Sequence, residues 1–288
     1  MRDRICRTFR YASQKVWDLL IDSNYFGFYQ TSGSNISRGV GLGEEAITDL
    51  LLVEISKRQP YDIITIKFSK NYEAQEGADW EWWILSRSGI IGLRFQAKRV
   101  HLVRGSYEYT HLDYLSGNKH QVDILIDHSQ NLGMVPLYIF YNFWDLDFPF
   151  YRFINPSINN LGCCRLYSRR NLGIAIASAF DVKDLVKQNP PKKSLSDVLP
   201  VSWPIYCLTC CNFSDLSESV SKFISRHILK KEHIKEYDFK VFIHDKIPEE
   251  VYLRLKGEFK DDAPMYTSYI IDLEAPHKEY ERIKSLLY

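Results

Sequence analysis

The sequence lacks both an excess of charge of one sign and any long hydrophobic run. Its 288 residues carry 37 Lys and Arg against 36 Asp and Glu, a formal net charge of +1. Overall charge therefore does not predict binding to nucleic acid or membrane, and a polyanionic partner would need a local basic patch. No apolar run approaches the roughly 18 residues of a membrane span, and no apolar segment follows the charged start MRDRICRTFR. We expect a cytoplasmic protein with no secretory signal and no membrane contact.

Cysteine and histidine motifs are also scarce. The six cysteines are expected to be thiols, because a chain that is not exported stays in a reducing compartment. Cys163-Cys164 and Cys207-x-x-Cys210-Cys211 provide one CxxC and one adjacent pair, short of the two ligand pairs of a zinc finger. The eight histidines form no HExxH pattern. Buried thiols are therefore expected rather than a zinc site.

The sequence does contain enough apolar material for a large core, with 45% hydrophobic and 25% charged residues. From residue 44 to residue 143 the periodicity predicts the order helix, strand, strand, strand, helix, strand. The segments are EEAITDLLLVEISKR, DIITIKF, DWEWWIL, GLRFQAKRV, HQVDILIDHSQNLG and MVPLYIFYNF. An earlier helix is expected over about residues 11–23, followed by a loop over residues 27–43.

The second half gives weaker signals. Strands are expected in NLGIAIASAF and at residues 237–243 and 266–273, and helices in VKDLVKQ, in SDLSESVSKFISRHILKK and after Pro248. We predict an α/β protein with a central mixed sheet flanked by helices. Residues 1–150 would form the core with its N-terminal helix, and residues 151–288 an α/β extension packed on it. A separate C-terminal domain is the alternative.

One hairpin carries a group of polar residues that suggests chemistry. A loop from Ser86 to Gly89 places Asp79 directly opposite Gln96, and a two-residue loop would place it opposite Lys98 instead. In both registers the three side chains share a face, since paired residues and residues two apart point the same way. A three-residue loop would separate them. The opposite face, with Leu93, Phe95 and Ala97, is expected to be core.

These residue types suit metal-assisted phosphodiester hydrolysis. Asp79 supplies a carboxylate oxygen and Gln96 an amide oxygen, and both are hard ligands that Mg²⁺ accepts. Lys98 adds a positive charge that can hold a phosphate or lower the pKa of a water molecule. A metal ion and an ammonium group that converge on one oxygen stabilise the negative charge of the transition state.

The same hairpin resembles that of a known nuclease superfamily. The predicted element order, with GADW followed by QAKR, resembles the PD-(D/E)xK, or restriction-endonuclease-like, nucleases. It is most similar to the Mrr-like branch, in which Gln replaces the acidic residue of the (D/E)xK motif, and to an uncharacterised bacterial family with GADWEWW and QAKR. The resemblance covers roughly residues 40–145. The sequence departs from the family at Ala78, where the family has Pro, and at the neutral Gln96.

The resemblance implies an αβββαβ nuclease core and a set of site residues. The implied metal is Mg²⁺, which Mn²⁺ can replace, and its implied ligands are Asp79, Gln96, the Ala97 carbonyl and Glu44. Glu44 is preferred to Glu45 because it lies three and seven residues before Ile47 and Leu51, on the buried face of its helix. Lys98 would activate the attacking water, Arg99 would contact a phosphate, and Gln121 would lie near the site.

Each of these residues also has a purely structural interpretation. Glu44 and Glu45 suit the first turn of any helix, Asp79 suits a strand start, and Lys98 suits an exposed strand position. Glu81 shares the face of Asp79, but its expected role is an ion pair with Arg94. Trp80 and Trp82 are expected in the core rather than stacked on bases.

We therefore expect a DNA endonuclease that depends on Mg²⁺, with a role in defence against foreign DNA as a further implication of the resemblance. The alternatives are a nuclease acting on RNA or branched DNA, and a catalytically inactive nuclease-fold subunit that binds or regulates. Expected partners are DNA and either a second copy of the chain or a partner subunit.

Overall fold

The structure is a computed structural model, and it describes most of the chain. The described residues are 2–25, 29–32, 35–38, 42–67, 78–161, 168–210, 215–236, 241–256, 266–273 and 276–287.

Seven strands of the described residues form one mixed sheet in the order β12-β11-β10-β5-β4-β13-β3. They are β3 (Ile63–Lys67), β4 (Trp80–Ser86), β5 (Gly89–Arg99), β10 (Val135–Tyr141), β11 (Ile174–Ser178), β12 (Trp203–Pro204) and β13 (Tyr266–Ile271). β5 is antiparallel to β4 and parallel to β10. β13 is parallel to β4 and antiparallel to β3, and β11 is antiparallel to both β10 and β12.

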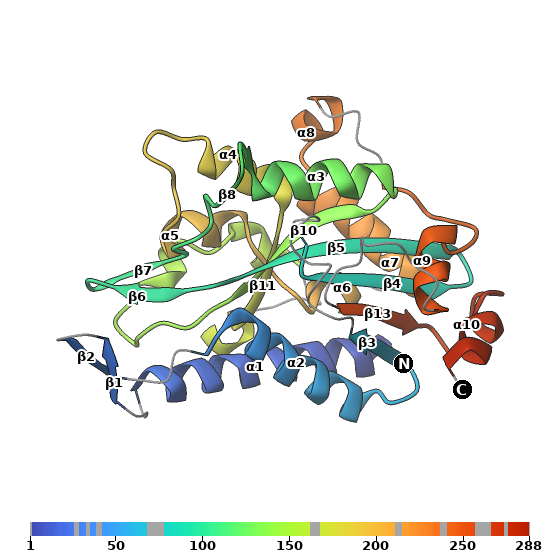
Figure 1. The fold of residues 1–288 in the computed structure, drawn as a ribbon, viewed down its shortest axis with the longest axis horizontal. Helices are drawn as coiled ribbons and strands as arrows, with labels where there is room; N and C mark the ends of the chain where they lie inside the picture. Colours follow the sequence, from blue (N-terminus) through green and yellow to red (C-terminus); the bar gives the residue numbers. More distant parts are fainter. Residues whose placement is uncertain are drawn as a thin grey trace.

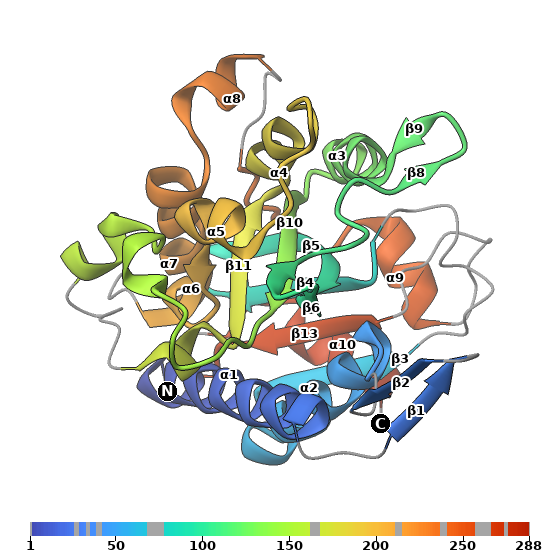
Figure 2. The ribbon, with the colours of Figure 1, turned by 90° about the vertical axis from the view of Figure 1, so that its left-hand side faces the viewer.

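Helices cover both faces of this sheet. They are α1 (Arg2–Tyr25), α2 (Glu44–Arg58), α3 (Gln121–Asn131), α4 (Ala179–Val186), α5 (Leu195–Val198), α6 (Cys207–Cys210), α7 (Leu216–Phe223), α8 (Lys231–Glu236), α9 (Glu249–Leu255) and α10 (Tyr280–Leu287). α1 and α2 lie on one side of the strands, and α3 and α4 lie on the other (Figures 1 and 2). The predicted α/β class, with a mixed sheet flanked by helices, is confirmed.

The order helix, strand, strand, strand, helix, strand is confirmed from α2 to β10, with two small hairpins inserted before α3. These hairpins are β6 (His101–Val103) with β7 (Ser106–Glu108), and β8 (Leu115–Ser116) with β9 (Lys119–His120). A third small hairpin, β1 (Tyr29–Ser32) with β2 (Asn35–Arg38), lies within the stretch predicted as a loop. α2 has the predicted bounds, since its buried positions repeat with helical spacing and Pro60 follows it.

Other predicted elements differ from the structure. α1 begins at Arg2 rather than near residue 11, because Ile5, Phe9, Ala12, Val16 and Leu20 form one buried stripe along its whole length. The long helix expected in SDLSESVSKFISRHILKK is α7, a π-helical turn (Ile224–Ile228) and a separate α8. The strand expected at residues 237–243 falls partly outside the described residues, and its described part is not a strand.

The insertion of β13 between β3 and β4 was not predicted. β13 pairs with β4 from Tyr266 to Ile271, so β3 has no direct contact with the β4–β5 hairpin in the sheet ladder. The sequences of β13 and β4 do not predict that these strands pair, because parallel pairing between distant segments depends on tertiary packing. The sheet therefore combines strands from both sides of residue 150.

The hairpin face opposite Asp79 is core, as predicted. Trp80 and Trp82 are each 1% exposed, and their rings meet edge to face with centroids 4.9 Å apart. Phe9 of α1 stacks on Trp82 with ring centroids 5.0 Å apart, and Phe95 of β5 meets it edge to face. These contacts fasten α1 to the hairpin, with aromatic geometry adding to the burial of apolar area.

The predicted pair of Glu81 and Arg94 is also confirmed. The two residues are direct cross-strand partners, the Arg94 Nε and Glu81 Oε1 atoms are 3.7 Å apart, and both side chains are fully buried. The buried ion pair keeps this side of the hairpin from being a continuous apolar surface.

The cysteine expectation requires a correction. Cys6 of α1 and Cys210 of α6 form a disulfide, with their Cα atoms 5.3 Å apart, because the start of α1 packs on α6. Cys207 is fully buried, and Cys163, Cys164 and Cys211 lie outside the described residues. Within the described part of the chain, no helix combines the length and apolar character that a membrane crossing requires.

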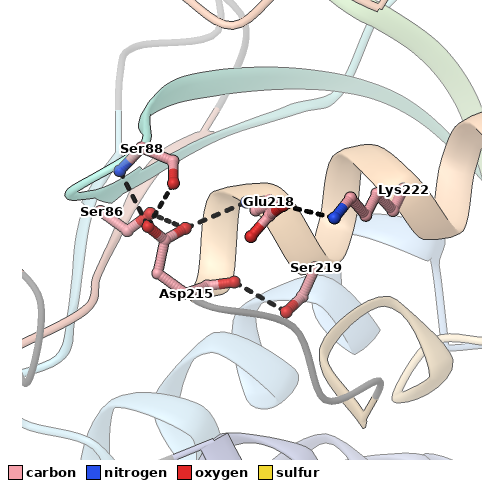
Figure 3. A network of polar contacts seen from close by, with 6 residues as sticks. All are labelled: Ser86, Ser88, Asp215, Glu218, Ser219 and Lys222. Atoms are coloured by element: carbon pink, nitrogen blue, oxygen red, sulfur yellow. Dashed lines mark hydrogen bonds and ion pairs between the residues drawn. The ribbon is translucent and has the colours of Figure 1, made fainter.

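The turn of the β4–β5 hairpin is held by the start of α7 (Figure 3). The Asp215 carboxylate accepts hydrogen bonds from the Ser86 hydroxyl at 2.7 Å, from the Ser88 amide at 2.8 Å and from the Ser88 hydroxyl. The same carboxylate caps α7 by accepting from the Glu218 amide at 3.1 Å. The Ser217 hydroxyl donates to the Gly89 carbonyl at 2.8 Å. A single acid thus fixes both the loop length and the position of α7.

These contacts make Asp215 acid-sensitive. Burial raises its pKa, but the hydrogen bonds from Ser88, Ser86 and the Glu218 amide outweigh burial and hold the pKa below its usual value of 3.8. A lowered folded-state pKa contributes stability above the unfolded-state pKa, and that contribution is lost as the pH falls through the folded-state value.

We predict that Asp215→Asn lowers the free energy of unfolding at pH 7 by about 1–3 kcal/mol, through lost charge-assisted hydrogen bonds. The difference from the unmodified chain should shrink as the pH drops below about 4, since the unmodified chain then loses the same contribution. Urea unfolding across pH 3–7 measures both effects, with Asp147→Asn on an exposed loop as the control. A difference that stays constant with pH would contradict the role of the carboxylate charge.

Candidate functional site

The predicted register of the hairpin is confirmed. β4 and β5 pair from Ser86 with Gly89 to Trp80 with Phe95. Asp79 directly precedes β4, and its amide donates to the Phe95 carbonyl at 2.9 Å. Gln96 and Lys98 are two residues apart on β5 and share a face of the sheet, and the Asp79 carboxylate contacts Gln96.

Asp79 and Gln96 are in direct contact. The Gln96 Nε2 donates to Asp79 Oδ2, and the Ala97 amide donates to the same oxygen at 2.7 Å. The Gln96 Nε2 also lies 3.4 Å from the Ala97 carbonyl oxygen. Asp79 is half-buried and Gln96 is 2% exposed. One amide nitrogen therefore lies between a carboxylate oxygen and a carbonyl oxygen at the border of the interior.

At the other end of the Gln96 amide, the Oε1 atom is buried, and no donor among the described residues reaches it. A buried acceptor without a hydrogen bond costs free energy. Rotating the amide by half a turn exchanges Oε1 and Nε2, so that oxygens of Asp79, Gln96 and Ala97 would converge on one point. Three oxygens of this kind form a suitable partial shell for Mg²⁺ or Mn²⁺, and the residues present fit the implied metal.

Lys98 lies on the same face and has its own partner. Its Nζ donates to Gln121 Oε1 at 2.8 Å, and the side chain is 5% exposed. Gln121 is the first residue of α3, where the chain passes over the edge of the site. The structure therefore brings Gln121 to Lys98, and the amide oxygen holds the ammonium group next to the strand that carries Gln96.

Glu44 faces the sheet but does not contact Asp79 or Gln96 in the structure. Its Oε1 accepts from the Arg99 backbone amide at 2.8 Å, one residue beyond Lys98, while Glu45 is exposed. The choice of Glu44 as the inward-facing acid agrees with this placement. Whether Glu44 joins a metal shell stays a prediction.

Arg99 is not a surface residue. It is 5% exposed, and its guanidinium group donates to the Leu42 carbonyl and to Asn24 Oδ1. Burial lowers the pKa of Arg99, and the nearby Glu44 charge opposes that shift. The guanidinium group is thus engaged inside the fold, and its contact with a phosphate stays a prediction.

Sequence reasoning missed two residues next to the site. Tyr138 of β10 is the register partner of Gln96, is fully buried, and its hydroxyl has no hydrogen-bond partner among the described residues. Burial, followed by the negative charges of Asp79 and Asp123, raises the pKa of Tyr138, so the hydroxyl stays protonated. Asp123 lies in the first turn of α3 and pairs with Lys183 at 2.8 Å. The alternation in VPLYIFY would have identified Tyr138 only if the pairing of β10 with β5 had been known.

Comparison with known proteins adds a family. A family described as a family of unknown function (DUF6615) matches residues 5–286. The chain belongs to the DUF6615 family. No curated protein matches the chain. The DUF6615 match spans both halves of the sequence, so it includes the hairpin, α3 and the C-terminal strand β13.

Changing Gln96 to Glu tests the metal fit of this DUF6615 site. Without metal, the variant loses the Nε2 donor and sets two carboxylates side by side, which should lower the free energy of unfolding. With Mn²⁺, the added charge should tighten binding by about 10-fold or more. Calorimetric titration of Mn²⁺ measures the affinity, and Gln130→Glu, at the far end of α3, adds the same charge as a control. Equal Mn²⁺ affinities for the two variants would contradict a metal position beside residue 96.

Proposed function

We propose that this chain is a metal-dependent nuclease that hydrolyses phosphodiester bonds in DNA. The observation that carries the proposal is the contact of the Gln96 amide with the Asp79 carboxylate and the Ala97 carbonyl, on the face of β5 that also carries Lys98. The resemblance of GADW and QAKR to the Mrr-like nucleases supports the same activity, and a role in defence against foreign DNA rests on that resemblance alone.

Asp79, Gln96 and the Ala97 carbonyl would hold a Mg²⁺ or Mn²⁺ ion. Such an ion supplies Lewis-acid stabilisation of the phosphate oxygens and a more acidic bound water. Only Asp79 in this set carries charge, so a divalent ion bound there would retain net positive charge to attract a phosphate diester.

Lys98 would orient the attacking water and stabilise the charge that develops on the phosphate. Its ammonium group is already held by Gln121 Oε1 at 2.8 Å. Positioning of this kind before the substrate arrives avoids reorganisation during the reaction. The Tyr138 hydroxyl, protonated and unpartnered among the described residues, is a further donor on the same face of the sheet.

A second candidate function is a nuclease-fold subunit that binds DNA or a partner without cutting. The hydrogen bond from Gln96 Nε2 to Asp79 favours it, because it satisfies Asp79 without a cation. Mn²⁺ titration separates the two candidates, since a subunit that has lost catalysis would show no Mn²⁺ binding dependent on Asp79.

We predict that the purified chain nicks or cuts supercoiled plasmid DNA with Mg²⁺ or Mn²⁺ and is inactive with chelator. Asp79→Asn and Lys98→Ala should each reduce the rate about 100-fold or more, as losses of transition-state stabilisation. Asp18→Asn and Lys222→Ala, which change the same residue types at partly exposed ion pairs, are matched controls and should cut normally.

The same assay should include single-stranded RNA and a branched DNA junction, which identify the substrate class. Cleavage that survives both Asp79→Asn and Lys98→Ala would overturn the assignment of this site. Circular dichroism of each variant shows whether it is folded.

A further inference from the structure

A second group of potential metal ligands lies between α4 and α8, away from the hairpin. Asp181 and Asp184 are three residues apart on α4 and therefore share a helix face. His233 of α8 meets them, with its Nε2 atom 3.0 Å from Asp184 Oδ2. One ligand atom from each of the three residues lies within 4.8 Å of the others. Figure 2 shows α8 at the outside of the α4 layer.

We propose that Asp181, Asp184 and His233 form a binding site for a divalent transition-metal ion, with Zn²⁺ as the ion that fits best. One imidazole nitrogen and two carboxylates are a ligand set that Zn²⁺ accepts, and a water molecule can complete four-fold coordination. Asp184 has a side chain that is 59% exposed, whereas His233 is 5% exposed. The site therefore has two buried ligands, Asp181 and His233, and one exposed ligand, Asp184, on the side from which an ion can enter.

Two of the three ligands are buried. Asp181 is 5% exposed, and its Oδ1 contacts the Lys230 ammonium group. The Asp181 carboxylate therefore already has a cation as its partner, and a metal ion would take the place of that ammonium group. Phe180 packs on His233 with ring centroids 5.5 Å apart, which holds the imidazole in place.

Lys230 is the competitor of a metal ion at this site. Its ammonium group contacts Asp181, but the side chain is 52% exposed and can withdraw into solvent. The neighbouring Lys183 is engaged elsewhere, 2.8 Å from Asp123. If the cluster binds metal, removing the Lys230 charge should tighten binding. If the cluster instead serves to bind the Lys230 ammonium group, removing that charge should lower the stability of the fold without creating a metal site.

Zinc titration of the metal-free full-length chain tests the proposal. We expect one Zn²⁺ that depends on the cluster, with a dissociation constant of about 10 µM or tighter and a raised unfolding temperature. His233→Ala and Asp184→Asn should each weaken this binding about 10-fold or more. Asp184 is largely exposed, so its variant is expected to fold even if the His233 variant does not. His111→Ala, at an exposed loop position, is the matched control and should bind as the unmodified chain does.

Lys230→Gln should bind Zn²⁺ more tightly than the unmodified chain. With Co²⁺ as probe, the absorption spectrum should lack a thiolate charge-transfer band, which excludes the cysteines as ligands. The proposal is overturned by any of three results: no Zn²⁺ binding at about 100 µM, binding unchanged in both His233→Ala and Asp184→Asn, or a Lys230→Gln chain that is destabilised and binds no Zn²⁺. Asp79→Asn should leave this binding intact, so the result is independent of the proposed nuclease site.

Discussion

The register between β4 and β5 is the constraint on which the candidate site depends. Successive side chains point to opposite faces of a strand, so a slip of one residue would carry Asp79 away from Gln96 and Lys98. The turn that sets the register is held by Asp215, which is 127 residues from its partner Ser88. The C-terminal half therefore contributes to the geometry of the site without supplying any of its ligands. A substitution at the start of α7 would alter the β4–β5 turn and, through the strand register, the position of Asp79 relative to Gln96 and Lys98.

The polar face of the hairpin is costly to bury. The Glu81–Arg94 pair is fully buried with its charged atoms 3.7 Å apart, and Lys98 has an amide oxygen as its partner. Among the buried atoms that lack a hydrogen bond within the described residues are Gln96 Oε1 and the Tyr138 hydroxyl, whose residues pair across β5 and β10. A buried polar atom of this kind costs free energy, and a bound ligand can complete its hydrogen bonding. These two atoms lie beside Asp79 and Lys98, which supports this face as the candidate for chemistry.

Much of the local structure could be predicted from the sequence, and little of the long-range pairing could. α2 and the hairpin register follow from periodicity and turn length, which act over a few residues. β13 lies beside β4, and Tyr138 beside Gln96, because segments far apart in the chain pair in parallel. The sequence of a single strand does not specify which distant strand it pairs with. The α4–α8 cluster is the same case: His233 lies 49 residues from Asp184, and nothing in the spacing connects them. Residues such as Arg99, which alternation alone left open to solvent, are buried by the helices that pack above the sheet.

A neutral ligand at position 96 would give the candidate site a lower affinity for a metal ion than a carboxylate would. It would also make metal binding depend more strongly on the presence of a substrate. A carboxylate at this position would set two negative charges in contact and would strongly favour a cation. With Gln96, the amide nitrogen donates a hydrogen bond to Asp79 instead. A metal ion would have to displace that hydrogen bond, which at a charged acceptor contributes about 1.5–3 kcal/mol. The negative charge of a bound phosphate diester would attract the metal ion and offset the loss of that hydrogen bond. The substrate would then favour the open amide, so metal and nucleic acid would bind cooperatively at this hairpin.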